Sequence, residues 1–117
     1  MIEGEWRILA VDYAGEALPG RNGRLQIIGA RFSLQIGGTP REVGAVEHDA
    51  SVSPATLDLV WREAGGDESR RLRAIVRVRG DLMQLCYYPE AAGQRPAAFD
   101  SKGTPPAILV RCRKENL

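Results

Sequence analysis

Short runs in which apolar and polar side chains alternate make up most of the chain, and glycine- or proline-rich turns separate them. Such alternation is typical of half-buried antiparallel strands, and no window holds the long apolar period of 3.6 residues that would indicate a helix. We therefore expect about eight strands, most of them joined in sequence by short turns. The clearest runs lie at 5–12, 42–49, 56–63 and 107–113, and a further short strand is expected at 97–99.

Two hairpins have a pattern that predicts their register. A two-residue turn at 80–81 places apolar residues opposite one another on one face: Val78 with Met83, Val76 with Leu85, and Ala74 with Tyr87. A turn at 29–30 does the same: it pairs Ile27 with Phe32 and Leu25 with Leu34. A slip of one residue would mix apolar and polar residues on both faces, so the pattern favours these registers.

Sequential hairpins with one apolar face fit either an up-and-down barrel or a sandwich, and a barrel has the advantage of leaving no open edge. We therefore predict an all-β, antiparallel up-and-down barrel that spans 1–117 as a single domain. Its expected interior side chains are mostly bulky, so we expect a largely filled barrel. They are Ile8, Leu25, Ile27, Phe32, Leu34, Leu57, Leu59, Val76, Val78, Met83, Leu85, Ile108 and Val110.

Composition and charge narrow the possible partners. The chain is 44% hydrophobic and 26% charged, which is typical of an ordered globular domain. Its 16 basic and 15 acidic side chains leave a net charge of +1, which argues against a dedicated nucleic-acid-binding protein. We find neither an apolar stretch of membrane-spanning length nor a signal-peptide pattern, so we predict a cytoplasmic protein that does not bind a membrane.

The two ends of the chain carry a recognisable combination of residues. Gly4 and Trp6 form a G-x-W triplet near the start of the first strand, and Arg111 and Arg113 lie in the last strand. This combination resembles the pattern of lipocalins and the wider calycin superfamily, in which a tryptophan plugs the closed end of the barrel and an arginine from the last strand lies across it. The resemblance implies a lipocalin-like barrel with Trp6 as the plug and Arg111 or Arg113 as its cover.

A second resemblance covers nearly the whole chain. Residues 4–20, 31–38, 55–61, 74–88 and 93–99 are similar to a family of small lipocalin-like domains of unknown function, which are abundant in planctomycetes and scattered through other bacteria. The match is most specific in "GDLMQLC" and the later "RPAAF". The family commonly has an aromatic residue near the position of Val76, so this chain departs there. The resemblance implies a fold and assigns no activity.

The segment 70–80 holds five arginines. One interpretation is a stripe of side chains that grips phosphates. The favoured interpretation is the solvated face of a strand, because Arg73, Arg77 and Arg79 alternate with apolar residues and outward charge discourages aggregation between sheet edges. Binding of single-stranded nucleic acid would also require aromatic side chains along the same face, where we expect only Tyr88.

Further candidate residues each have two interpretations. His48 could act as a general base with Asp49 or Glu47, but we favour a polar residue at the end of a strand. Asp58 is expected to face outward, although the reversed register would place its carboxylate inside the barrel. Arg95 could bind a carboxylate of a ligand or fasten its own loop to backbone carbonyls.

The two cysteines belong to no metal-binding or redox motif. We expect free thiols at Cys86 and Cys112 rather than a disulfide, in keeping with a cytoplasmic protein. The predicted hairpin register places Cys86 on the outer face of the barrel, where we expect it to be accessible and reactive.

Three classes of function remain, and the first is favoured. It is a non-catalytic module that binds a protein partner, for instance a cytoplasmic immunity or inhibitor protein. The second is a carrier of a small apolar ligand inside the barrel. The third is an enzyme, ranked last because no nucleophile motif, metal cluster or cofactor signature is present. The expected contact residues for a protein partner are Arg73, Arg77, Arg79, Tyr88 and Arg95, with the loops 65–69 and 90–95 as alternatives.

Overall fold

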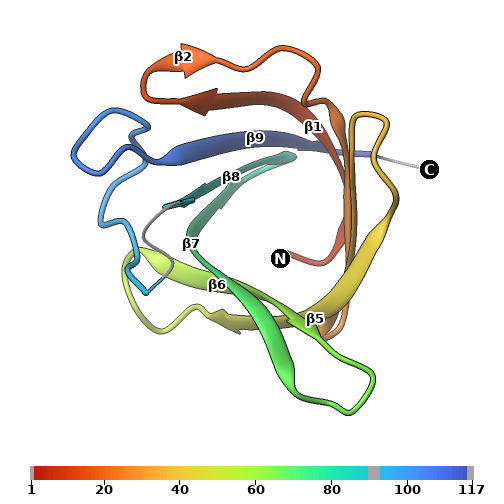
Figure 1. The fold of residues 1–117 in the computed structure, drawn as a ribbon. Coiled ribbons are helices and arrows are strands. Elements are labelled where there is room, and N and C mark those ends of the chain that lie inside the picture. Colours follow the sequence, from red (N-terminus) through yellow and green to blue (C-terminus); the bar gives the residue numbers. More distant parts are fainter. Residues whose placement is uncertain (1, 90–92, 116–117) are drawn as a thin grey trace.

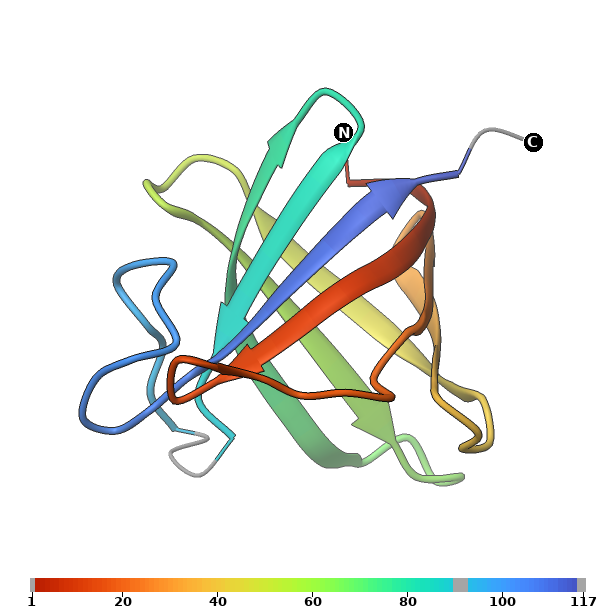
Figure 2. The same cartoon turned by 90° about the horizontal axis from the view of Figure 1, so that it is seen from above.

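The predicted all-β architecture is confirmed by the computed structural model, which describes residues 2–89 and 93–115. Among these residues there is no helix, and nine strands follow one another around a barrel (Figures 1 and 2). The strands are β1 (Gly4–Tyr13), β2 (Glu16–Ala17), β3 (Gly23–Ile28), β4 (Arg31–Ile36), β5 (Glu42–Asp49), β6 (Ala55–Arg62), β7 (Glu68–Arg79), β8 (Leu82–Tyr87) and β9 (Ile108–Lys114).

The barrel closes because the first and last strands are neighbours. Each strand from β3 to β8 pairs antiparallel with the next, β3 also pairs with β1, and β1 pairs with β9 from Trp6–Lys114 to Tyr13–Ile108. The β1–β9 register shifts between Ile8 and Ala10, and beyond this irregularity Val11 rather than Ala10 is the buried residue of β1. The short strand β2 pairs only with the end of β1, so it lies outside the closed ring of eight strands.

The alternation of side chains predicted both hairpins correctly. Val78 pairs with Met83 and Leu85 with Val76 across β7 and β8, and the β3–β4 hairpin has the expected partners as well. Every residue predicted to face the interior belongs to the main apolar core or packs against it. The inward face of the barrel was therefore readable from a period of two residues.

Trp6, the expected plug, has a side chain that is fully buried in the main apolar core. Its indole Nε1 donates a hydrogen bond to the carbonyl of Ile2 at 2.9 Å, so the buried polar atom is satisfied. The expected arginine cover is wrong, because Arg111 and Arg113 are exposed on the outer face of β9. The cation over the indole is Lys114, whose Nζ lies 5.6 Å from the ring centroid.

Gly4 makes room for this cation. A Cβ at position 4 would lie 2.7 Å from Cε of Lys114, and the backbone of Gly4 has a φ of +136°, which other residues rarely adopt. The glycine of the G-x-W triplet thus allows the lysine side chain to cross the N-terminal strand and reach the indole of Trp6.

The long connection between β8 and β9 folds back over the outside of the barrel wall (Figure 2). It covers a second apolar cluster, in which Ile75, Cys86 and Leu109 from the outer faces of β7, β8 and β9 are buried together with Ala107. Phe99 of the connection packs against this cluster, so the strand expected at 97–99 is wrong and these residues form a bend instead.

Candidate functional site

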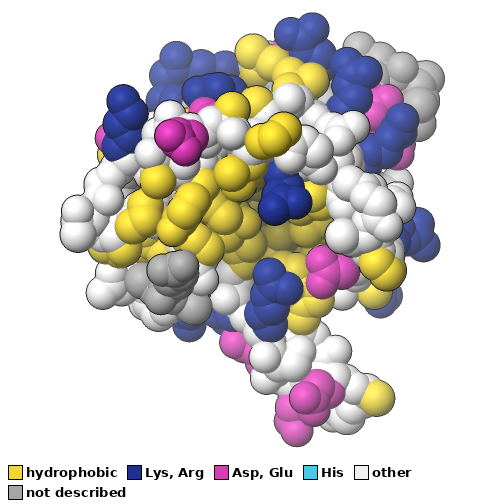
Figure 3. Space-filling view, turned by 45° about the horizontal axis from the view of Figure 1, so that its top comes forward, with side chains coloured by type: hydrophobic (Ala, Val, Ile, Leu, Met, Phe, Trp, Pro, Cys, Tyr) yellow, Lys and Arg dark blue, Asp and Glu magenta, His cyan; other side chains and the backbone are white. Residues whose placement is uncertain are grey.

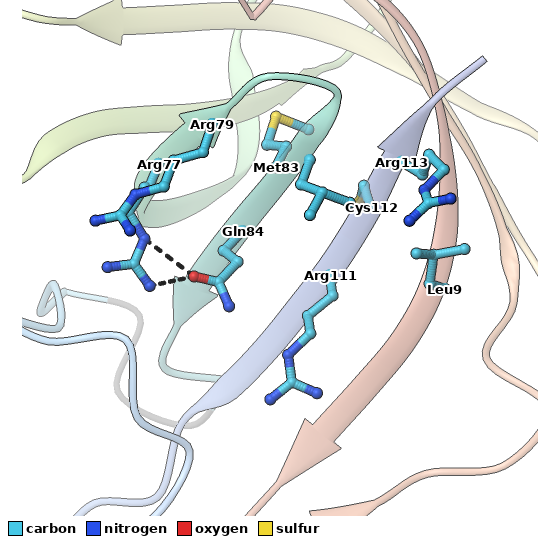
Figure 4. A pocket seen from close by; sticks show the side chains of 9 residues that line it. Leu9, Arg77, Arg79, Met83, Gln84, Arg111, Cys112 and Arg113 are labelled. Carbon is cyan, nitrogen blue, oxygen red and sulfur yellow. Dashed lines mark hydrogen bonds between the residues drawn. The ribbon is translucent and has the colours of Figure 1, made fainter.

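Four arginine side chains line a groove of about 490 Å³ on the outer face of β7, β8 and β9, which we call the arginine groove (Figure 4). The sheet register arranges them as two pairs. Leu82 of β8 lies between Arg79 and Arg113. Gln84 of β8 lies between Arg77 and Arg111. The groove thus combines Arg77 and Arg79, which were predicted as partner contacts, with the two arginines of β9. The resemblance to lipocalins had implied that one of these two covers Trp6.

Arg77 is held in place by neighbours within the protein. Its Nε donates to Oε1 of Gln84 at 3.0 Å, and its Nη2 donates to the same oxygen (Figure 4). Its guanidinium carbon lies 4.3 Å from the ring centroid of Phe99 in the β8–β9 connection. Contacts with an amide oxygen and an aromatic face orient this guanidinium without neutralising its charge.

The other three arginines of the groove differ in their access to carboxylates. Arg111 forms an ion pair with Asp12 at 3.3 Å. Within the described part of the chain, Arg79 and Arg113 form no ion pair or hydrogen bond through their guanidinium groups, and both side chains are exposed. The arginine groove therefore keeps most of its positive charge available to a ligand.

The other predicted contact residues lie outside the arginine groove. Nη1 of Arg95 donates to Oδ1 of Asp58 at 2.6 Å and to a backbone carbonyl of β7 at 2.8 Å, so Arg95 fastens the β8–β9 connection to the barrel wall. Tyr88 packs against the apolar cluster beneath that connection. Arg73 lies beside Asp58 in the β6–β7 register and is half-buried.

Asp58 lies at the centre of a charged network on the outer face of β6. It is only 7% exposed, and its two carboxylate oxygens accept hydrogen bonds from Arg71 at 2.8 Å and from Arg95 at 2.6 Å. Arg71 also contacts Glu47 at 2.7 Å and Glu68 at 2.8 Å. Burial by itself would raise the pKa of Asp58, but the hydrogen bonds from the two arginines outweigh it and lower this pKa.

The open end of the barrel forms a second concave site, which we call the cup. It has a volume of about 570 Å³, and apolar side chains gather in the hollow (Figure 3). Below it, a recess of only about 40 Å³ reaches toward the barrel centre, so the deeper interior is filled as expected. The cup is lined by Ile8, Val11, Leu18, Arg21, Ile36, Thr39, Pro40, Glu42, Tyr87, Ile108 and Val110.

The closed eight-stranded antiparallel barrel is compatible with a calycin-like fold. Comparisons with protein-family models, with curated proteins and with solved structures find no match to this chain. Function is therefore inferred from the geometry of the arginine groove and the cup.

The candidate catalytic residues lie at the exposed end of β5. His48 is exposed on β5, and Oδ1 of the neighbouring Asp49 accepts hydrogen bonds from the backbone and the hydroxyl of Ser51 at 2.9 and 2.5 Å. In residues 2–89 and 93–115, no group of three or more His, Cys, Asp or Glu side chains could hold a metal ion. The same residues contain no helix with the length and hydropathy to cross a membrane.

Two loops, 65–69 and 90–95, are the alternative contact surfaces predicted from the sequence. Residues 65–67 belong to the turn between β6 and β7, residues 68 and 69 already belong to β7, and all five are exposed. In the loop 90–95, residues 90–92 lie outside the described residues, and the described end holds Arg95, which is occupied by Asp58. Residues 65–69 and 93–95 do not line the arginine groove or the cup.

The two thiols are free, as expected, but the predicted accessibility of Cys86 is wrong. Cys86 does face outward from β8, yet the β8–β9 connection buries it completely. Cys112 faces the interior of the barrel, so the two sulfurs lie on opposite sides of the wall. Burial raises the pKa of both thiols, that of Cys112 to about 12.

We expect neither thiol to react readily in the folded protein, because a buried thiol with a raised pKa supplies little accessible thiolate. With a disulfide reagent at pH 8, Cys86 and Cys112 should react at least about a hundredfold more slowly than in the urea-unfolded chain. Release of the coloured thiolate product measures both rates. Fast reaction of one thiol in the native protein would show that the connection over Cys86 opens easily.

Proposed function

We propose that this protein is a non-catalytic binding module that holds a small apolar ligand in the cup. The observation that carries the proposal is the volume of about 570 Å³ at the open end of the barrel, lined mainly by apolar side chains. Sites for small molecules commonly have volumes of about 300–1,000 Å³ and combine apolar walls with a few polar groups.

The polar groups of the cup are placed to orient such a ligand. Tyr87 lines both the cup and the recess, and burial raises its pKa, so its hydroxyl stays protonated at neutral pH and can donate a hydrogen bond. Arg21 and Glu42 lie at the same open end and offer one charge of each sign. Because the recess is small, the ligand would occupy the mouth of the barrel rather than its centre.

The test is binding of a neutral fluorescent probe, N-phenyl-1-naphthylamine, which has no charge to attract it to the arginine groove. We expect the wild-type protein to enhance its fluorescence. We expect Ile36→Trp to weaken binding at least tenfold, because Ile36 lines both the cup and the recess and a larger side chain would fill them.

The matched control is Ile28→Trp, at an apolar residue that is 65% exposed and lines neither the cup nor the recess. It should leave probe binding unchanged, and circular dichroism should show that both variants fold. Absence of binding by the wild-type protein, or equal binding by Ile36→Trp, would rule out the cup as the ligand site.

Other expectations from the sequence remain proposals. The quoted sequence segments support membership of the planctomycete-type family of lipocalin-like domains, and a cytoplasmic location accords with the two free thiols. A protein partner, for instance in the role of an immunity or inhibitor protein, would use a different surface from the cup, and a charged groove suits that role better than an apolar hollow.

A further inference from the structure

We propose that the arginine groove docks an acidic segment of a partner protein in an extended conformation. This proposal goes beyond ligand binding in the cup and does not depend on it, because the two sites open on different faces: the cup at the end of the barrel, the groove on its outer wall. It rests on the spacing of the four guanidinium groups, on their charge balance and on the apolar residues between them.

The spacing of the arginines matches that of side chains along an extended chain. Arg77 and Arg79 lie two positions apart on β7, and Arg111 and Arg113 lie two positions apart on β9. Alternate residues of a strand are about 6.6–6.8 Å apart, and carboxylates at alternate positions of an extended peptide have the same separation. Since only β8 lies between the two pairs, they are roughly 9.5 Å apart, which leaves room for a single chain.

The charge of the arginine groove contrasts with that of the opposite end of β7. There a single guanidinium, that of Arg71, contacts Glu47, Asp58 and Glu68 within 2.7 to 2.8 Å. In the groove, Asp12 is the one carboxylate that forms an ion pair with any of the four arginines, counting only the described residues. Charge complementarity therefore favours a partner that brings its own carboxylates.

The remaining lining favours a protein over a nucleic acid. Leu9 and Leu82 also line the groove and are 46% and 43% exposed, although each is a large apolar side chain. They offer apolar contact to the methylene groups of the acidic side chains of a docked peptide. No aromatic ring is found among the groove's described lining residues, so it lacks the stacking platform that proteins use to hold single-stranded bases.

The experiment uses a fluorescently labelled decapeptide that alternates glutamate with leucine, and a matched peptide with glutamine in place of glutamate. We expect fluorescence anisotropy to show that the wild-type protein binds the glutamate peptide, with affinity falling as salt rises, and does not bind the glutamine peptide. The double variant Arg79→Glu/Arg113→Glu should bind the glutamate peptide roughly thirtyfold more weakly or worse, because two attractions become repulsions.

The matched control is Arg31→Glu/Arg41→Glu, which has the same net charge as the groove variant but changes exposed residues on β4 and in the β4–β5 turn. It should bind the peptide within about threefold of the wild-type protein, since long-range effects of net charge are modest at physiological salt. Both double variants change exposed side chains, so they should keep the circular dichroism spectrum and melting temperature of the wild-type protein.

Three results would overturn the proposal. The first is failure of the wild-type protein to bind the glutamate peptide. The second is equal loss of affinity in the groove variant and the control, which would reduce the effect to net charge. The third is tighter binding of oligothymidylate than of the peptide, which would assign the arginine groove to nucleic acid. The naphthylamine probe should bind the groove variant normally, so failure of one proposal is distinguishable from failure of the other.

Discussion

Replacing Trp6 with alanine should destabilise the folded protein by about 3–5 kcal/mol, the range observed for removal of a large buried aromatic side chain. Trp6 is fully buried at the closed end of the barrel, where the indole fills the space between the strands. A loss of this size is a large part of the total stability of a domain, which is about 5–15 kcal/mol. Urea unfolding followed by circular dichroism measures the change.

A second substitution separates the volume of the indole from its hydrogen bond. Trp6→Phe keeps an aromatic plug but removes the Nε1 donor that contacts Ile2, so we expect a smaller loss of about 1–2 kcal/mol. Trp6→Ala, unlike Trp6→Phe, also leaves Lys114 without an aromatic ring beneath its ammonium group. A loss below about 1 kcal/mol for Trp6→Ala would show that the closed end does not depend on this plug.

Replacing Asp58 with asparagine should cost about 2–4 kcal/mol at pH 7, because breaking a buried ion pair leaves charge behind without compensation. The variant keeps the size of the side chain and removes the negative charge that both Arg71 and Arg95 contact. Arg71 retains its two glutamates, whereas Arg95 loses the one carboxylate with which it forms an ion pair among the described residues. We therefore expect the β8–β9 connection to loosen as well, with faster amide hydrogen exchange in residues 93–107.

The advantage of the wild-type protein over Asp58→Asn should depend on pH in a defined direction. The pKa of Asp58 is lowered in the folded state, so its stabilisation is fully present above the unfolded value of about 3.9. It is lost as the pH falls through the folded pKa. Urea unfolding at pH 7 and near pH 3 should therefore show a difference between the two proteins that shrinks in acid.

The control for this prediction is Glu42→Gln. Glu42 pairs with Arg70 at 3.7 Å, and both side chains are largely exposed, so the loss should stay within about 1 kcal/mol at either pH. If Asp58→Asn were as mild as this control, the carboxylate would not be essential for the position of Arg95. The charged network would then be an ordinary surface cluster.

The strand registers and the interior residues were predictable because a buried face imposes a strict period of two on the sequence. The same rule would also have corrected the expected cover of Trp6. Val110 and Cys112 face inward, so the next inward residue of β9 is Lys114, and the two arginines beside it must face outward. The resemblance to lipocalins suggested an arginine, and in this instance the alternation was the better guide.

The burial of Asp58 and Cys86 could not be predicted in this way, because both face outward and the outer side of a barrel usually contacts water. They are buried because the β8–β9 connection covers the wall, and its prolines and polar residues have no periodicity that reveals where it packs. The arginine groove was missed as a unit for a related reason. Its two pairs lie about thirty residues apart in sequence and meet only through β8.

The pairing of β1 with β9 also determines when the protein can become a barrel during synthesis. The ladders from β3 to β8 join strands that follow one another closely along the chain, so each can form soon after its second strand leaves the ribosome. β1 must wait for almost a hundred more residues, which takes roughly 5–20 seconds at ordinary rates of translation. Throughout that interval its unpaired edge can pair with another nascent chain, which exposes the first strand to misassembly.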